Sequence, residues 1–342
     1  MKNMNKYENC LLCPRKCGIN RSTGQTGVCG VSSEIKVARA ALHYWEEPCI
    51  SGKRGSGAVF FSGCSLHCVF CQNREISDGK AGKVISKERL SDIFMELADK
   101  GANNINLVTP GQYIPDIVGA VNDAKSRGMK LPIIYNTSGY ENVTELKLLE
   151  GIVDVYLPDF KYMDSTLSAR YSRAKDYPSV AKQALSEMVR QQPDVVIDDA
   201  TGLIQKGVIV RQLLLPGHVN DAKAVLKYIY DTYHDHVYIN MMRQFTQIAL
   251  KNFVKAVLNY LYVTYHDHVY ISMMSQFTPI ALKDYPEINR TVTRREYERL
   301  VDYALEIGIT NAFIQEGDVA KDSFIPAFDC EGVEYLPFFL IK

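Results

Sequence analysis

Short apolar runs alternate along the chain with segments whose apolar residues recur at helical spacing. The strand-like runs occupy 58–61, 105–109, 133–135, 153–157 and 208–215. Apolar residues between 90 and 97 are spaced for one helix face that Gly101 ends, and those between 114 and 121 form another that ends near Gly128. Because strand and helix patterns alternate, we predict an α/β fold built from parallel βα units.

The N-terminal stretch differs from this pattern, since it carries glycines and cysteines instead of apolar runs. Its cysteines follow a C-x2-C-x3-C-x11-C spacing and are Cys10, Cys13, Cys17 and Cys29. A segment this short cannot build an adequate hydrophobic core and needs a bound metal to hold its fold together. Four thiolates can close around zinc or around an iron–sulfur cluster, and spacing alone does not choose the metal. We therefore predict a metal-binding module at 1–52 and a larger domain at 53–342.

A tandem repeat interrupts the second half of the chain. Residues 223–250 and 255–282 are nearly identical. Each copy contains one helix pattern and one strand pattern, so the repeated segment has the size of one βα unit. Two copies are too few for a solenoid or a propeller. The extra unit either extends the sheet by one strand or leaves one copy outside it. The shorter connection favours the first copy as the neighbour of the strand at 208–215.

Composition narrows the class of protein. Lysine plus arginine and aspartate plus glutamate number 39 each, so the formal net charge is zero, which disfavours binding to nucleic acid or to a membrane surface. No apolar stretch reaches the length of a membrane span, and the polar N-terminus has no signal core. We therefore expect a cytoplasmic protein whose nine cysteines are reduced and serve metals instead of disulfides.

The most informative chemistry directly follows the first strand-like run. Cys64, Cys68 and Cys71 have the spacing C-x3-C-x2-C. Three close thiolates can hold three irons of a cubane [4Fe–4S] cluster and leave the fourth iron free to bind a small molecule. The alternatives are buried thiols or a zinc site. Structural zinc is usually closed by a fourth ligand, and His67 suits that place poorly in so tight a loop.

This motif, with Phe70 before the third cysteine and Gln72-Asn73 after it, resembles the signature of the radical S-adenosylmethionine (SAM) superfamily. It is similar more narrowly to relatives of pyruvate formate-lyase activating enzyme, and the four-cysteine leader is similar to that of one branch of these proteins. The resemblance implies an open (β/α)6 partial barrel with its active site at the C-terminal ends of the strands. It also implies that an electron from a [4Fe–4S] cluster splits SAM into methionine and a 5′-deoxyadenosyl radical.

The resemblance and the rule about strand ends together give candidate SAM-binding residues. They are Phe70, Thr109, Asn136, Asp159, Lys161, Arg211 and Gln276. Phe70 would cover the adenine, and Arg211 would pair with the SAM carboxylate. Asp159 and Lys161 resemble a polar pair at this place in activating enzymes. Many relatives have Gly-Gly-Glu where this chain has Thr109 and its neighbours, so backbone carbonyls or Thr109 would have to hold the SAM amino group.

The function implied by the resemblance is hydrogen abstraction from a partner, with a glycyl-radical enzyme as the leading candidate and a flavodoxin or ferredoxin as electron donor. The residues do not identify which side chain, if any, is catalytic beyond the cofactor ligands. Two alternatives stay open. One is radical SAM modification of a small molecule or peptide. The other is a non-catalytic iron–sulfur or zinc protein whose site the duplication has disabled.

Overall fold

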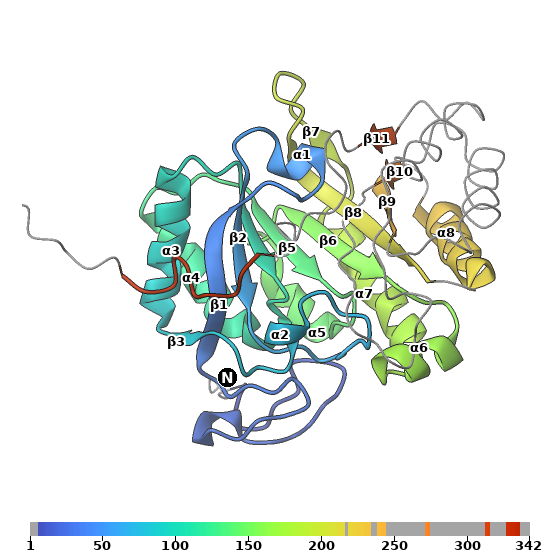
Figure 1. The fold of residues 1–342 in the computed structure, drawn as a ribbon, viewed down its shortest axis with the longest axis horizontal. Coiled ribbons are helices and arrows are strands. Elements are labelled where there is room, and N and C mark those ends of the chain that lie inside the picture. Colours follow the sequence, from blue (N-terminus) through green and yellow to red (C-terminus); the bar gives the residue numbers. More distant parts are fainter. Residues whose placement is uncertain are drawn as a thin grey trace, which may run out of the picture.

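The computed structural model describes residues 6–215, 218–233, 238–243, 271–273, 312–314 and 326–335. Its main feature is a sheet whose parallel strands are β2 (Ser56–Phe61), β4 (Ile105–Val108), β5 (Ile133–Thr137), β6 (Val155–Phe160), β8 (Ile204–Leu214) and β9 (Tyr238–Arg243), shown in Figure 1. Each strand is hydrogen-bonded in parallel to the next one in this series. The five predicted apolar runs all contribute to it, and a mostly parallel sheet agrees with a partial barrel.

Antiparallel strands add to both sides of this series. They are β1 (Ile35–His43), β3 (Lys83–Ile85) and β7 (Val196–Ile197). The order across the described sheet is β3-β1-β2-β4-β5-β6-β8-β7, with β9 also pairing with β8. Strand β1 falls within the predicted module 1–52, yet it pairs with β2 over most of its length. Its apolar positions are buried by this pairing and by the helix layer, so the sheet extends into the N-terminal stretch.

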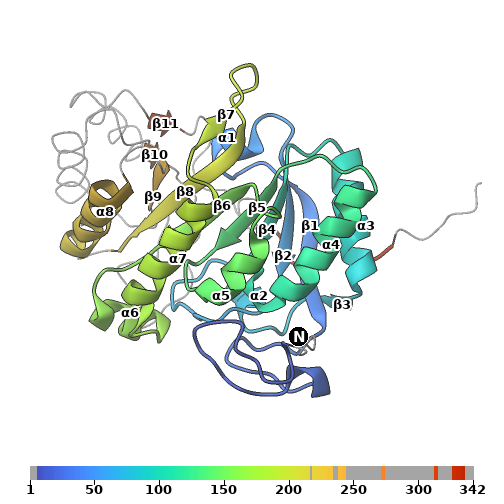
Figure 2. The same cartoon turned by 180° about the vertical axis from the view of Figure 1, so that it is seen from behind.

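Helices cover one face of the sheet, as Figure 2 shows. The longer ones are α3 (Lys87–Asp99), α4 (Ile114–Ser126), α7 (Tyr177–Gln191) and α8 (Val219–Tyr233). The shorter elements are α1 (Pro48–Ser51), α2 (Arg74–Ser77), α5 (Val143–Leu146), α6 (Ser165–Ser172) and the 3-10 turns η1 (Arg21–Thr23), η2 (Gly111–Tyr113) and η3 (Lys147–Leu149). No helix in the described residues is both long and apolar enough to cross a membrane.

The sequence pattern located α3 and its end correctly. Leu90, Ile93, Phe94 and Leu97 are all buried against the sheet, as their helical spacing predicted. Gly101 follows the helix with φ of 85°, a left-handed conformation that glycine adopts without a steric penalty.

The two repeat copies have different surroundings. Strand β9 lies in the first copy and pairs with β8, which places Tyr238 opposite Ile209. The second copy contributes β10 (Ile271–Met273), which pairs in parallel with β11 (Ala312–Ile314) in a separate two-stranded sheet. The first copy therefore occupies the position beside β8, because α8 supplies a short crossover to it.

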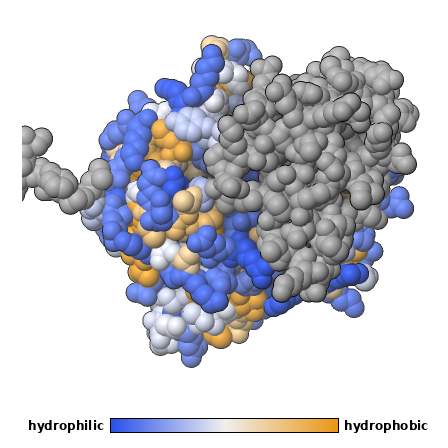
Figure 3. All heavy atoms as spheres, viewed as in Figure 1, coloured by the Kyte–Doolittle hydropathy of each residue, from blue (hydrophilic) through white to orange (hydrophobic). Residues whose placement is uncertain are grey.

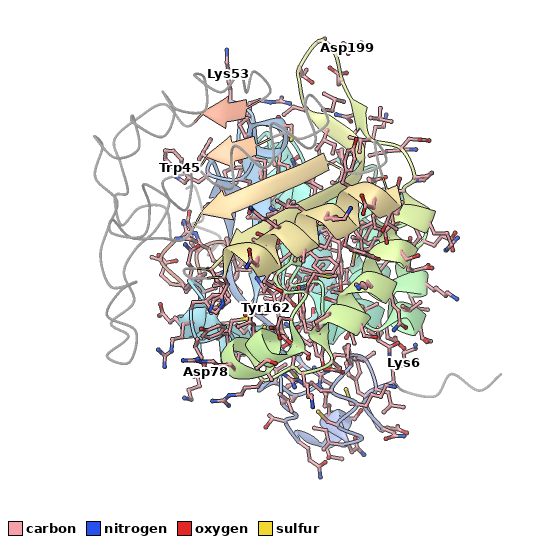
Figure 4. The ribbon with its side chains drawn as sticks, turned by 90° about the vertical axis from the view of Figure 1, so that its right-hand side faces the viewer. Lys6, Trp45, Lys53, Asp78, Tyr162 and Asp199 are labelled. Carbon is pink, nitrogen blue, oxygen red and sulfur yellow. The ribbon has the colours of Figure 1, made fainter. Side chains whose placement is uncertain are left out.

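Residues 6–34, which we call the leader, contain η1 as their only helical or strand element. Its chain is held by turns, including hydrogen bonds from Cys10 N to Ile19 O and from Gly18 N to Cys10 O, both 3.0 Å long. Lys6, labelled in Figure 4, forms an ion pair with Glu145 where the leader meets the rest of the molecule. In Figure 1 the leader lies at the lower edge, beside the loops that follow the strands.

Candidate functional site

The loop after β2 carries the three closely spaced cysteines and is folded tightly at the C-terminal end of that strand. Gly63 has φ of 93°, and a Cβ atom there would lie 2.7 Å from the carbonyl oxygen of Cys29, so only glycine fits. Cys71 N donates to Cys68 O (3.1 Å), and Leu66 N donates to the sulfur of Cys64 (3.4 Å). This position is where enzymes built from parallel βα units carry their chemistry.

The thiols of this loop are largely shielded from water. Burial raises the pKa of Cys68 to about 11 and that of Cys71 to about 12. Such thiols are neutral at pH 7 on their own, and a metal that binds them must displace their protons. The hydroxyl of Ser172 donates to the Cys68 sulfur at 3.0 Å, which stabilises the thiolate form.

A single zinc ion does not suit this arrangement. His67, the possible fourth ligand, instead places Nε2 2.5 Å from the carbonyl oxygen of Val28. Thiolates on one zinc lie about 3.8 Å apart, whereas those of a cubane cluster sit on separate irons and are spaced more widely. Three thiols without a fourth therefore fit the cluster better than zinc.

These cysteines open onto a cavity, here called the main cavity, which collects side chains from the ends of β2, β4, β5, β6 and β8. Its lining includes Cys64, Cys68, Cys71, Phe70, Thr109, Asn136, Asp159, Lys161 and Arg211. The structure thus brings together every described residue that the sequence proposed for SAM and its cluster. Gln276 lies outside the described residues.

A largely buried ion network forms part of the wall of the main cavity. Arg211 Nε donates to Asp159 Oδ1 (2.9 Å), and a second nitrogen of Arg211 donates to Asn136 Oδ1 (2.6 Å). Lys161 Nζ donates to the other oxygen of Asp159 (2.6 Å). Burial alone would raise the pKa of Asp159, but the two cations hold it below its ordinary value. Asp159 is therefore ionised, and it orients both cations.

Sequence reasoning missed another part of the cavity wall, formed by the end of β1 and the segment that follows it. His43, Trp45, Glu46 and Glu47 all line the main cavity. Glu46 lies 3.6 Å from Arg211, and burial raises its pKa. No motif marked these residues, because β1 joins the sheet antiparallel to β2 and its pairing is visible only in the fold.

Trp45, labelled in Figure 4, and Tyr44 are the exposed aromatic residues of this segment. On the described part of the face in Figure 3, hydrophilic residues surround smaller groups of hydrophobic ones.

Gln112 is a further residue that sequence reasoning missed. Its side-chain nitrogen donates to the carbonyl oxygens of Ser62 (3.0 Å), Gly63 (3.1 Å) and Thr109 (2.8 Å). The amide therefore ties the end of β4 to the start of the cysteine loop. Thr109 has φ of 56°, an uncommon conformation for threonine, and the bond to its carbonyl helps to fix it.

The leader cysteines line a second cavity, here called the leader cavity. Cys10, Cys13, Cys17 and Cys29 all face it, together with Arg21, Glu141 and Cys64. Burial raises the pKa of Cys13 to about 12 and also raises that of Cys29. The sequence proposed these four residues as one metal site, and the fold gathers them around one space.

Comparison with known proteins gives one family match. Residues 58–204 match the family described as the radical SAM superfamily. An uncharacterized protein of Methanocaldococcus jannaschii, MJ0674, is 28% identical over 248 residues, which cover 70% of this chain and 67% of the relative. A crystal structure of Streptococcus suis SuiB bound to S-adenosylmethionine aligns with a TM-score of 0.41 and 12% identity, over 74% of this chain and 48% of SuiB. The chain thus spans about half the length of SuiB.

Proposed function

We propose, from the premise that residues 58–204 form a radical SAM domain, that this protein cleaves SAM reductively in the main cavity. Such a domain implies a [4Fe–4S] cluster, SAM and a radical mechanism. The observation that carries the proposal is that one cavity is lined both by three cysteine thiols and by a network of positively and negatively charged side chains.

The donor chemistry of the main cavity suits both groups. Cys64, Cys68 and Cys71 would hold three irons of the cluster. When bound, the cluster supplies the electron that breaks a carbon–sulfur bond of SAM and so allows 5′-deoxyadenosine to form.

The ion network would bind the amino-acid end of SAM, which carries a carboxylate and an ammonium group. Lys161 and Arg211 offer positive charge to the carboxylate, and Arg211 presents a planar fork of donors. Asp159 and Glu46 offer carboxylates to the ammonium. Because these four side chains are only 11–14% exposed, their interactions with a zwitterion are stronger than they would be in water.

Apolar residues surround the reacting region. Phe60, Phe61, Leu66 and Phe70 are buried and line the main cavity. They provide the apolar surface that an adenine ring needs, and they exclude water that would quench a reactive species. Phe70 stands directly before the third cysteine, which suits it to cover the adenine.

We further propose that the acceptor of this chemistry is a partner protein of the glycyl-radical class, reached in the cytoplasm, with a flavodoxin or ferredoxin as electron donor. The support is the resemblance of the cysteine motif and of the Asp159–Lys161 pair to activating enzymes. Capture of partners from the native organism, followed by a glycyl-radical EPR signal in the captured protein, would test this step.

The core proposal is tested by anaerobic reconstitution with iron and sulfide, reduction with dithionite, addition of SAM and chromatography for 5′-deoxyadenosine. The parent should form it, and Cys68→Ala should not. Cys49→Ala is the matched control, because Cys49 is a buried thiol that lines neither cavity. Equal product from Cys68→Ala and the parent would overturn the proposal.

A further inference from the structure

The leader cavity has the features of a second redox site. Its four cysteines come from a segment whose own core is small and consists of Tyr7, Cys10 and Leu12. A backbone N–H, that of Val28, points at the sulfur of Cys17 from 3.5 Å. Amide donors of this kind tune the potential of iron–sulfur centres.

Arg21 places a buried positive charge beside these thiols. Its side chain is 1% exposed, and it donates to the carbonyl oxygens of Val31, Ser32 and Gln112 and to the sulfur of Cys10, 3.7 Å away. Among the described residues no carboxylate forms an ion pair with it. A buried cation needs a counter-charge, and carbonyl groups supply none. Thiolates on a metal provide that charge.

The four leader thiols line one cavity, so each can ligate a different iron of a cubane cluster. Because the adjoining loop offers three more thiols to the main cavity, the leader cavity suits an iron–sulfur cluster.

The leader cavity also touches the cysteine loop directly. Cys64 lines both cavities. Cys64 N donates to Cys29 O at 3.2 Å, so a ligand of one site is hydrogen-bonded to a ligand of the other. Arg15 Nε donates to Ser65 O (2.8 Å), which holds the two segments together. The path from sulfur to sulfur consists of covalent bonds and one hydrogen bond.

We propose that Cys10, Cys13, Cys17 and Cys29 hold a second iron–sulfur cluster that passes electrons to the cluster on Cys64, Cys68 and Cys71. The relay rests on the proposed function, whereas the existence of the second cluster does not. A one-electron donor of the reduced ferredoxin or flavodoxin class loses one electron. The leader cluster gains it and then returns to its oxidised state as the loop cluster is reduced. No covalent bond is made or broken, and no proton is transferred.

The first experiment counts metal and sulfide after anaerobic reconstitution, in the presence of both iron and zinc. The parent should contain about eight irons and eight acid-labile sulfides per chain. The triple variant Cys64→Ala, Cys68→Ala, Cys71→Ala should keep about four of each, because only the leader cluster remains. One zinc and no sulfide in that variant would overturn the proposal, whatever the parent does with SAM.

The second experiment tests the relay with photoreduced ferredoxin as the probe. In the double variant Cys13→Ser, Cys17→Ser, reduction of the loop cluster by ferredoxin should slow by at least about tenfold, while reduction by dithionite keeps the parental rate. In the fully reduced parent, the EPR signals of the two clusters should broaden each other, and this broadening should vanish in the variant. An unchanged ferredoxin rate would refute the relay.

Arg21 gives a test that preserves all the thiols. Arg21→Met should lower the reduction potential of the leader cluster, because loss of the cation makes the added electron less favourable, and Arg21→Lys should restore most of it. A redox titration followed by EPR measures both variants. Equal potentials in the parent and Arg21→Met would contradict the role given to this charge.

Discussion

Replacing Gln112 by methionine tests whether one amide holds the cysteine loop in place. The side chain is 7% exposed, and methionine has a similar volume, so the change removes hydrogen bonds without opening a cavity. The lost contacts are those to the carbonyls of Ser62, Gly63 and Thr109. The side-chain amide has two N–H groups for these three acceptors, so their loss costs about 2 kcal/mol of stability. A buried carbonyl left without a donor costs about 1 kcal/mol more.

We therefore expect Gln112→Met to lower the free energy of unfolding by about 3 kcal/mol. Denaturant unfolding followed by circular dichroism measures this loss, and the deoxyadenosine assay should show a parallel fall in rate as the loop loosens. Gln183→Met is the matched control, because Gln183 is exposed and its side chain donates to Ser179 within the same helix, so little change is expected. A loss below about 1 kcal/mol in Gln112→Met would refute the reasoning.

Three further substitutions probe charge and backbone. Arg211→Met leaves Asp159 without its main cation, so unfolding should become easier by about 3–5 kcal/mol and SAM binding in calorimetry should be lost, whereas tight SAM binding would contradict this role. Burial raises the pKa of Glu141 from 4.5 to about 7, so the free energy of unfolding should fall by about 3 kcal/mol as pH rises from 4.5 to 7. The denaturant midpoints at pH 5 and pH 8 should therefore differ less in Glu141→Gln than in the parent. An equal difference in the two proteins would contradict the assignment. Gly139 has φ of 76°, and a Cβ atom there would lie 2.3 Å from the carbonyl oxygen of Asp159. Gly139→Ala should therefore lower the thermal midpoint far more than Gly101→Ala, because no atom lies within 4 Å of a Cβ at Gly101. Equal midpoints in the two variants would argue against that contact.

Most of what could be predicted about the fold and the candidate site came from the cysteine motif and the apolar runs. The runs located the parallel strands because buried strands in such sheets are continuously apolar. Once those strands were placed, the rule about strand ends put Asp159, Lys161 and Arg211 beside the cysteine loop, and all three line the main cavity. Glu46 and Gln112 escaped this reasoning, since one follows an antiparallel strand and the other acts through backbone carbonyls.

The sequence by itself determined which cysteines are candidate ligands and which strands run parallel, because spacing and hydrophobic periodicity are local properties of the chain. Only the tertiary structure decided what lies next to each ligand. It brought Cys29 into hydrogen-bond contact with Cys64, buried Arg21 among thiols and carbonyls, and placed the first repeat copy beside β8. These outcomes depend on the docking of segments far apart in sequence, which is set by packing and by the pairing of buried polar groups over the whole fold.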